Sequence, residues 1–143
     1  MSFPKAKGDQ FFYHEIAIAF KASEFTLLAK ELIDLDDVAD LYKKEIGYRK
    51  HNQAMLVLLG HNKSKETIVI GNCHLYYAPK MDHIKFAQAN FILDKAAAFC
   101  RRHNMEAKPI PFVCCGDFNS LPQSAAVSAF YGEDLYDVDK TVW

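Results

Sequence analysis

The chain has 143 residues, of which 50% are hydrophobic and 13% aromatic, and its 17 basic and 18 acidic side chains give a net charge of -1. This length and composition fit one globular domain that buries roughly two-thirds of its unfolded surface, which argues against intrinsic disorder. The near-neutral charge excludes an overall cationic field for attracting nucleic acid, so any polyanion has to be held by a local site.

The first third of the chain predicts two strands and a short helix. Residues 14–21 are short, apolar and rich in isoleucine, which indicates a buried strand. Residues 25–33 favour a second strand, although Leu27 to Leu32 would also suit a helix. In residues 34–48 acidic side chains precede basic ones, an order that suits a short helix with a solvated acidic face rather than a metal site. The acidic residues are Asp34, Asp36, Asp37 and Asp40.

The middle of the chain predicts a hairpin followed by a helix. Residues 53–60 and 66–75 are apolar runs separated by a polar turn, which indicates two antiparallel strands. Asp82 offers a cap for a helix over residues 84–102, where apolar residues recur at helical spacing. The predicted buried stripe is Phe86, Ala89, Leu93, Ala96, Ala97 and Cys100, and the residues expected off that stripe are Lys85, Gln88, Lys95, Arg101 and Arg102.

The last third predicts a strand and a short helix. An apolar run follows the connector Met105 to Pro111, which contains two prolines. Pro122 stands where a first helical turn begins, and residues 124–131 follow as a short helix. The order strand, hairpin, helix, strand, helix indicates a mixed α/β sandwich. No internal repeat or linker divides it.

The polar residues that follow the last predicted strand form the first candidate site. The apolar run stops at Gly116 and then presents Asp117 and Asn119. Because alternate side chains of an extended backbone point the same way, this pair is expected to converge while Phe118 turns into the core. A carboxylate favours a hard cation such as Mg²⁺, and an amide adds a neutral donor and acceptor. A strand that ends in an Asp/Asn turn is the alternative.

A second candidate group follows the hairpin. His74 ends one strand as Asp117 ends another, so the two would face one crevice if the strands are neighbours, and a histidine there could donate a hydrogen bond to a phosphate oxygen. The alternative is a satisfied core histidine. Tyr77, Pro79 and Lys80 then offer a stacking platform and a cation for a nucleic acid, or belong to a loop pinned to the core by its tyrosines.

Cysteine usage and the N-terminus indicate the compartment. The cysteines are Cys73, Cys100, Cys114 and Cys115, without a Cys-x-x-Cys spacing, which favours reduced thiols in an intracellular protein. A composite zinc site from Cys73, His74 and Cys114 remains open. No signal peptide or membrane span is predicted, so the protein is expected to be soluble and cytoplasmic, with a mitochondrial or nuclear location as alternatives.

Several of these segments resemble, in order and spacing, the endonuclease/exonuclease/phosphatase superfamily. Within it the chain is similar to the carbon catabolite repressor type deadenylases, the angel proteins and the 2′-phosphodiesterase. The resemblance extends from about residue 12 to the C-terminus. It is carried by Ala17 to Lys21, His74 to Tyr76, Pro79-Lys80, Ile84 to Gln88 and Cys115 to Ser124.

The resemblance implies a DNase I-like, four-layer α/β sandwich. It also implies a Mg²⁺-dependent 3′-5′ exoribonuclease of mRNA decay that hydrolyses phosphodiesters of poly(A) or oligoadenylate. Asp117 would align or deprotonate the attacking water and hold the metal with Asn119. His74 would hydrogen-bond a phosphate oxygen, and Pro79 would pack against a base. A non-catalytic RNA- or protein-binding module and a phosphatase of the superfamily are the alternatives.

The chain also departs from that family pattern. The family has an upstream asparagine, a metal-binding glutamate and a C-terminal Asp-His pair, and the deadenylases commonly have a polar residue in place of Ala78. Residues 1–143 are therefore expected to be a partial domain that is inactive or nearly so alone. Uncovered apolar sheet surface is expected to cause self-association, which light scattering would test.

Overall fold

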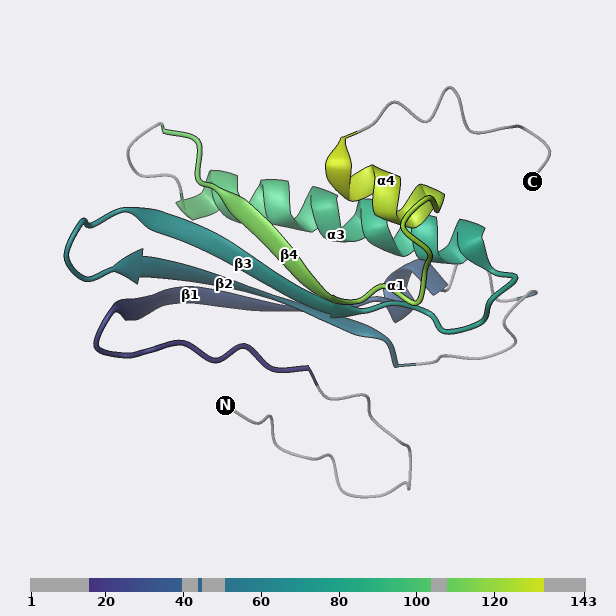
Figure 1. Ribbon diagram of the computed structural model, residues 1–143, viewed down its shortest axis with the longest axis horizontal. Helices are drawn as coiled ribbons and strands as arrows, with labels where there is room; N and C mark the ends of the chain where they lie inside the picture. Colours follow the sequence, from purple (N-terminus) through teal and green to yellow (C-terminus); the bar gives the residue numbers. More distant parts are fainter. Residues whose placement is uncertain (1–15, 40–43, 45–50, 104–107, 133–143) are drawn as a thin grey trace, which may run out of the picture.

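The computed structural model describes residues 16–39, 44, 51–103 and 108–132. Its strands are β1 (Phe25–Asp34), β2 (Gln53–His61), β3 (Thr67–His74) and β4 (Phe112–Asp117), and its helices are α1 (Asp36–Ala39), α3 (Asp82–His103) and α4 (Ala125–Tyr131). Figure 1 shows the sheet with α3 and α4 stacked above it. None of the described helices is long and apolar enough to cross a membrane.

The four strands form one mixed sheet in the order β1-β2-β3-β4. β2 pairs antiparallel with both β1 and β3, which confirms the predicted hairpin, whereas β3 and β4 are parallel. Parallel neighbours need a long connection, and α3 supplies it. The carboxyl ends of β3 and β4 therefore lie at the same edge of the sheet.

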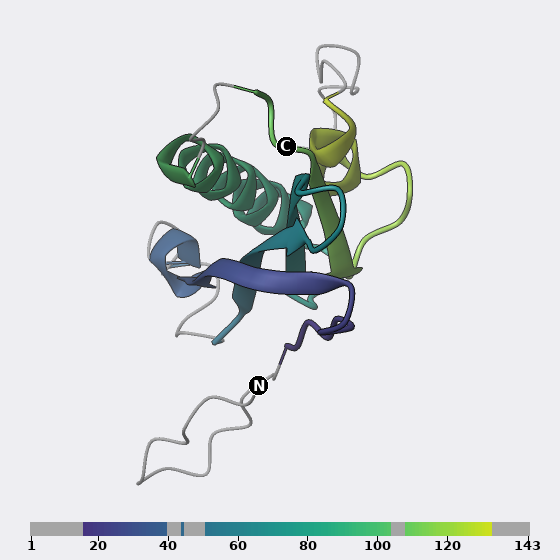
Figure 2. The ribbon, with the colours of Figure 1, turned by 90° about the vertical axis from the view of Figure 1, so that its left-hand side faces the viewer.

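The main core lies between the sheet and the helix layer, and Figure 2 shows α3 and α4 on the same side of the strands. Ala89 and Ala96 of α3 are buried as predicted, but Ala97 is exposed. The buried set also contains residues outside the predicted stripe, namely Ile84, Lys85, Gln88, Ile92 and Phe99. Because α3 packs against α4 as well as facing the sheet, its buried surface is wider than the predicted stripe. The placement of Lys85 and Gln88 off the buried surface was therefore wrong.

The other face of the sheet is covered in part by the segment before β1. Ile16 and Ile18 pack against the cluster of Met55, Val57 and Leu59 on β2. The strand predicted for residues 14–21 is wrong over the described residues 16–21, since they adopt no strand structure. A side chain, Asn72 Nδ2, donates to the Ala17 carbonyl at 2.8 Å in place of a backbone ladder.

The acidic segment after β1 also differs from expectation. Asp36 is 1% exposed, so it does not lie on a solvated helix face. Both of its carboxylate oxygens accept from the His51 backbone N–H at 3.1 Å, because residue 51, just before β2, lies beside the start of α1. Asp37 is exposed as predicted, whereas Asp40 lies outside the described residues.

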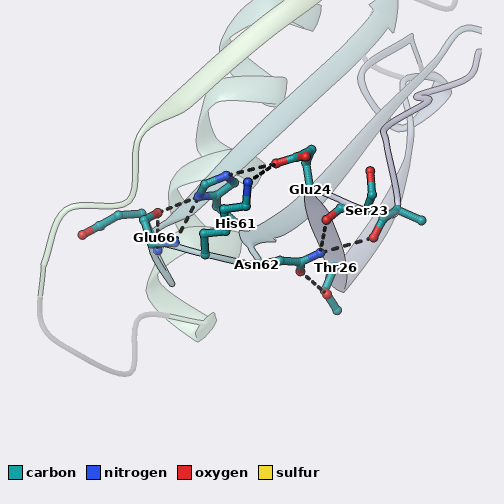
Figure 3. A network of polar contacts seen from close by, with 9 residues as sticks. Ser23, Glu24, Thr26, His61, Asn62 and Glu66 are labelled. Atoms are coloured by element: carbon teal, nitrogen blue, oxygen red, sulfur yellow. Dashed lines mark hydrogen bonds and ion pairs between the residues drawn. The ribbon is translucent and has the colours of Figure 1, made fainter.

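The opposite end of the sheet from the carboxyl ends of β3 and β4 is held by a polar network around Asn62 (Figure 3). The Asn62 amide nitrogen donates to two backbone carbonyls of the turn at residues 21–24, at 3.1 and 3.2 Å. Its oxygen accepts from the Thr26 hydroxyl at 2.7 Å. His61 Nε2 lies 3.8 Å from a carboxylate oxygen of Glu24. These contacts fix the β2–β3 turn against the start of β1.

Candidate active site

His74 and Asp117 meet at the carboxyl ends of β3 and β4. The register pairs these two residues directly, and paired residues of neighbouring strands share a face of the sheet. His74 Nε2 lies 3.9 Å from Asp117 Oδ2, with 25% of the histidine side chain and 64% of the aspartate side chain exposed. The strands are thus neighbours, and an imidazole and a solvent-accessible carboxylate occupy one edge.

Gly116 allows β4 to approach β3 at this point. Its φ is +137°, and an added Cβ would lie 2.0 Å from the Cys73 carbonyl oxygen. No side chain fits there, and L-residues rarely adopt that backbone conformation. The glycine that interrupts the apolar run is therefore required by the pairing that places Asp117 beside His74.

Asn119 lies next to this pair, but its backbone is not extended as predicted. The strand ends at Asp117, and Asn119 adopts a left-handed backbone with φ of 47°. Its backbone N–H donates to Asp117 Oδ1 at 2.9 Å, so the Asp/Asn turn considered as the alternative is present. Its side-chain nitrogen donates to the Leu75 carbonyl at 2.9 Å. The side chain can therefore offer its oxygen, Oδ1, to a ligand.

Phe118 turns back into the core between these two residues, as the sequence indicated. Its ring lies 5.0 Å from the ring of Phe130 in α4, centroid to centroid. This packing attaches the loop after β4 to the helix layer.

A buried lysine of α3 bonds to the loop that follows β4. Lys85 in the first turn of α3 has 2% of its side chain exposed, and its ammonium donates to Asp82 Oδ1 at 3.0 Å. It also donates to the backbone carbonyl of Asn119 at 2.9 Å. Sequence reasoning placed Lys85 off the buried stripe and missed this role, although an acidic residue three positions earlier was a usable signal.

Two buried amides support the loop after β3. Gln88 in α3 is 1% exposed, and its Oε1 accepts from the Tyr76 backbone N–H at 2.8 Å. Asn52, which is 3% exposed, donates from Nδ2 to the His74 carbonyl at 3.0 Å. Buried polar groups of this kind are costly unless bonded, so these bonds hold the backbone around His74 in one position.

The predicted substrate residues lie on the surface beside this loop. Tyr77 is 61% exposed, and Pro79 and Lys80 are exposed as well. Tyr76, in contrast, is 6% exposed and packs with Ile84. The loop is thus pinned to the core by Tyr76, while Tyr77 remains available to a ligand.

A cavity of about 320 Å³ opens between the two loops. Pro79 lines it from the β3 side, and Asn119, Leu121 and Gln123 line it from the β4 side. Its size is at the lower end of the range for small-molecule sites, which is about 300–1,000 Å³. Of the predicted site residues, Pro79 and Asn119 therefore border one common depression, whereas Tyr77 and Lys80 are not among its lining residues.

Two thiols lie on the helix-facing side of the sheet beneath the site. The Cys73 thiol hydrogen-bonds to the Cys114 sulfur, which lowers the pKa of Cys114. The same contact, together with burial, raises the pKa of Cys73. His74 lies on the opposite face from both, and no group of three His, Cys, Asp or Glu side chains within the described ranges could hold a metal ion. The composite zinc site is therefore wrong.

The donor set at the edge of β3 and β4 is chemically suited to a hard cation. Asp117 supplies a solvent-accessible carboxylate and Asn119 an amide oxygen. Mg²⁺ is usually bound by one or two carboxylates, with water and substrate phosphate completing its coordination shell. The residues present thus fit magnesium as part of its ligand set.

Comparison with known proteins agrees with this fold. No family model matches the chain. An endonuclease/exonuclease/phosphatase family protein from Bacteroides thetaiotaomicron aligns with a TM-score of 0.62 at 17% identity, over 79% of this chain and 38% of that chain. The described residues therefore have the α/β fold of the endonuclease/exonuclease/phosphatase superfamily.

Sequence similarity narrows the relationship. The chain is homologous to the CCR4-Not complex 3′-5′-exoribonuclease subunit Ccr4 of Kluyveromyces lactis, 30% identical over 127 residues. It is also 30% identical to ANGEL2, a 2′,3′-cyclic phosphatase, with a TM-score of 0.63 over 78% of this chain and 30% of that chain. The match to Ccr4 covers 80% of this chain and 16% of the Ccr4 subunit. Both relatives are hydrolytic enzymes by name, and the chain spans less than a third of each.

Proposed function

We propose that this chain carries the β3–β4 portion of the active site of a Mg²⁺-dependent 3′-5′ exoribonuclease that hydrolyses phosphodiesters in adenylate-rich RNA. The carrying observation is the juxtaposition of His74 and Asp117 at 3.9 Å on an open sheet edge. Asn119 is fixed beside them by bonds from its backbone and side-chain nitrogens. Homology to an exoribonuclease subunit supports the assignment.

In this proposal each residue has a role that its position supports. Asp117 orients and deprotonates the attacking water and contributes a carboxylate to the metal. Asn119 contributes Oδ1 to the metal or the scissile phosphate. His74 donates a hydrogen bond to a non-bridging phosphate oxygen, where charge develops during displacement. Magnesium, when bound, neutralises charge on the phosphate.

The exposed loop after β3 supplies the substrate contacts in this proposal. Tyr77 and Pro79 stack on bases, and Lys80 lies near the RNA backbone. Stacking tolerates any base, so the preference for adenylate has to be tested separately. We place the activity in cytoplasmic mRNA decay, and we propose that residues 1–143 alone bind RNA without efficient turnover.

The experiment is Mg²⁺-dependent binding of a fluorescent oligo(A) with a free 3′ end, measured by anisotropy. We expect Mg²⁺ to tighten binding, and Asp117→Asn to remove that increase, because the carboxylate holds the ion. Asp94→Asn, at an exposed position on α3, is the matched control and should behave like the unmodified chain. Oligo(A) affinity that changes neither with Mg²⁺ nor with Asp117→Asn would favour the non-catalytic module instead.

The partial-domain expectation has its own test. Release of AMP from oligo(A) by the purified 143-residue chain should be negligible, and robust release would overturn it. The transcript on both sides of the coding region for residues 1–143 should encode an asparagine and a glutamate upstream and an Asp-His pair downstream.

A phosphatase is the second candidate, because ANGEL2, at 30% identity, is a 2′,3′-cyclic phosphatase. Oligonucleotides that end in a 2′,3′-cyclic phosphate or in a 3′-hydroxyl separate the two candidates. The exoribonuclease proposal expects the 3′-hydroxyl substrate to bind at least as tightly as the cyclic phosphate. Clear preference for the cyclic end would favour the phosphatase.

A further inference from the structure

Lys85 is the most unusual charged residue near the site. Its side chain is 2% exposed, whereas lysine is almost never fully buried unless it is paired. A surface role would require an exposed ammonium, so the position of Lys85 needs an explanation from the groups that it contacts. Those groups are one carboxylate, Asp82, and one backbone carbonyl, Asn119.

The carbonyl that Lys85 contacts belongs to a site residue with a left-handed backbone. Asn119 has φ of 47°, a conformation that asparagine tolerates better than most residues with a Cβ but that still depends on the contacts around it. Its backbone N–H is bonded to Asp117 and its side-chain nitrogen to Leu75. The Lys85 ammonium supplies the third contact, at the carbonyl.

These contacts leave one polar atom of Asn119, Oδ1, without a bond among the described residues. A small rotation of the loop would move this oxygen away from the edge where Asp117 lies. Lys85 borders the cavity but bonds to neither Asp117 nor His74, and its ammonium is engaged by Asp82 and the Asn119 carbonyl. Its contact with the Asp117 edge therefore passes through Asn119.

We propose that Lys85 is a positioning residue, which fixes the Asn119 carbonyl and thereby directs Asn119 Oδ1 to the metal-phosphate site. This inference rests on the proposed function for the identity of the ligand. The position of the loop itself does not depend on that function. Groups that orient metal ligands in this way typically contribute about 10- to 100-fold to metal affinity.

The experiment compares Mg²⁺ binding by the 143-residue chain with that of Lys85→Met, which keeps the length of the side chain and removes its charge. NMR titration of the Asn119 side-chain amide gives the dissociation constant. We expect roughly tenfold or greater weakening, together with exchange broadening of the Asn119 amide signals. Lys95→Met on the same helix is the control, because Lys95 lies over the Phe91 ring and contacts no site residue.

A double-mutant cycle separates positioning from general stability. Asn119→Gly removes the side chain while keeping the carbonyl, and glycine tolerates the left-handed backbone. In that background Lys85→Met should cause no further loss of Mg²⁺ affinity. An equal loss in both backgrounds, or no loss in either, overturns the proposal.

If Lys85→Met does not fold, a measurement on the unmodified chain tests the positioning role of Lys85. The Lys85 ammonium resonance should shift during the Mg²⁺ titration with the same midpoint as the Asn119 amide, while that of Lys95 stays constant. A Lys85 signal that stays constant while Asn119 shifts contradicts the proposal. Absence of any Mg²⁺ binding instead overturns the proposed function. In that case the Asn119 amide signals of Lys85→Met are compared with those of the unmodified chain, and Lys85→Gln is used if the methionine variant is unfolded. Signals that stay sharp and unshifted would overturn the positioning role as well.

Discussion

The two ends of the sheet use polar side chains in opposite ways. At the turn end, the Asn62 amide places its nitrogen and oxygen on partners within the protein. At the other end, buried Lys85 holds the backbone of Asn119 while Asp117 remains 64% exposed. A polar network whose members bond one another is typical of structural support. Polar groups held firmly from beneath but open to solvent are typical of a site.

The largest expected effect is at the site end, where the backbone leaves no room for a side chain. Gly116→Ala should lower the free energy of unfolding by roughly 3 kcal/mol or more, because its Cβ would meet the Cys73 carbonyl. Urea denaturation followed by circular dichroism measures the change. Gly132→Ala, with φ of +67° and nothing within 4 Å of the added Cβ, should cost about 1 kcal/mol. Equal losses of stability in the two variants would show that the contact with the Cys73 carbonyl adds nothing to the cost of the positive φ at Gly116.

The next effect concerns the turn end. Asn62→Ala should lower the free energy of unfolding by about 2 kcal/mol, because the hydroxyl and carbonyl partners lose their bonds. Mg²⁺-dependent binding of oligo(A) should stay unchanged. Lys63→Ala is the control, since its side chain is 80% exposed and its ion pair is 4.0 Å long, and it should cost less than about 0.5 kcal/mol. Weaker Mg²⁺-dependent binding in Asn62→Ala would show that the two ends of the sheet are coupled, and would contradict a purely structural role for the Asn62 network.

A surface change at the site end should affect binding without affecting stability. Tyr77→Ala is expected to weaken oligo(A) binding by about 1–2 kcal/mol through lost stacking, and to change the free energy of unfolding by less than about 0.5 kcal/mol. Fluorescence anisotropy and urea denaturation measure the two quantities. Tyr131→Ala, with a 74% exposed ring at the end of α4, should change neither. The same loss of binding in both variants would assign Tyr77 no particular role.

The smallest effect is on the thiols beneath the site. Cys73→Ala removes the S–H donor to Cys114, so the pKa of Cys114 should rise towards the usual thiol value. The thiolate fraction of Cys114 at a fixed pH then falls, which the pH dependence of its Cβ chemical shift reports. Cys100→Ala should leave the midpoint of Cys114 in place. An unchanged midpoint in Cys73→Ala would remove Cys73 as the cause of the lowered pKa.

The elements were predictable where local patterns determine them. The hairpin and α3 follow from apolar runs, a polar turn and helical spacing, and all were found close to the predicted bounds. Residues 16–21 were misassigned because their isoleucines indicate burial, and burial does not require backbone pairing. Asp36 was misassigned because its partner, the His51 backbone, comes from a later part of the chain.

The site was predictable only where its residues follow strands. His74 and Asp117 were singled out because each ends an apolar run, but their contact depended on a strand order that the sequence does not show. Lys85 and Gln88 were placed off the buried face because charged and amide side chains are usually solvated. The bond from Lys85 to Asn119 joins residues 34 positions apart, and no local spacing reveals it.

The close approach at Gly116 has a consequence for changes in chain length. If one residue were inserted into or deleted from β4, the pairing would shift, a side chain would face the Cys73 carbonyl, and Asp117 would point towards the helices. Such a change abolishes the His74–Asp117 pair outright, and so would a change within β3, whereas insertions in loops away from these two strands leave it intact. A residue without any side chain thus restricts where this chain can lengthen or shorten during evolution.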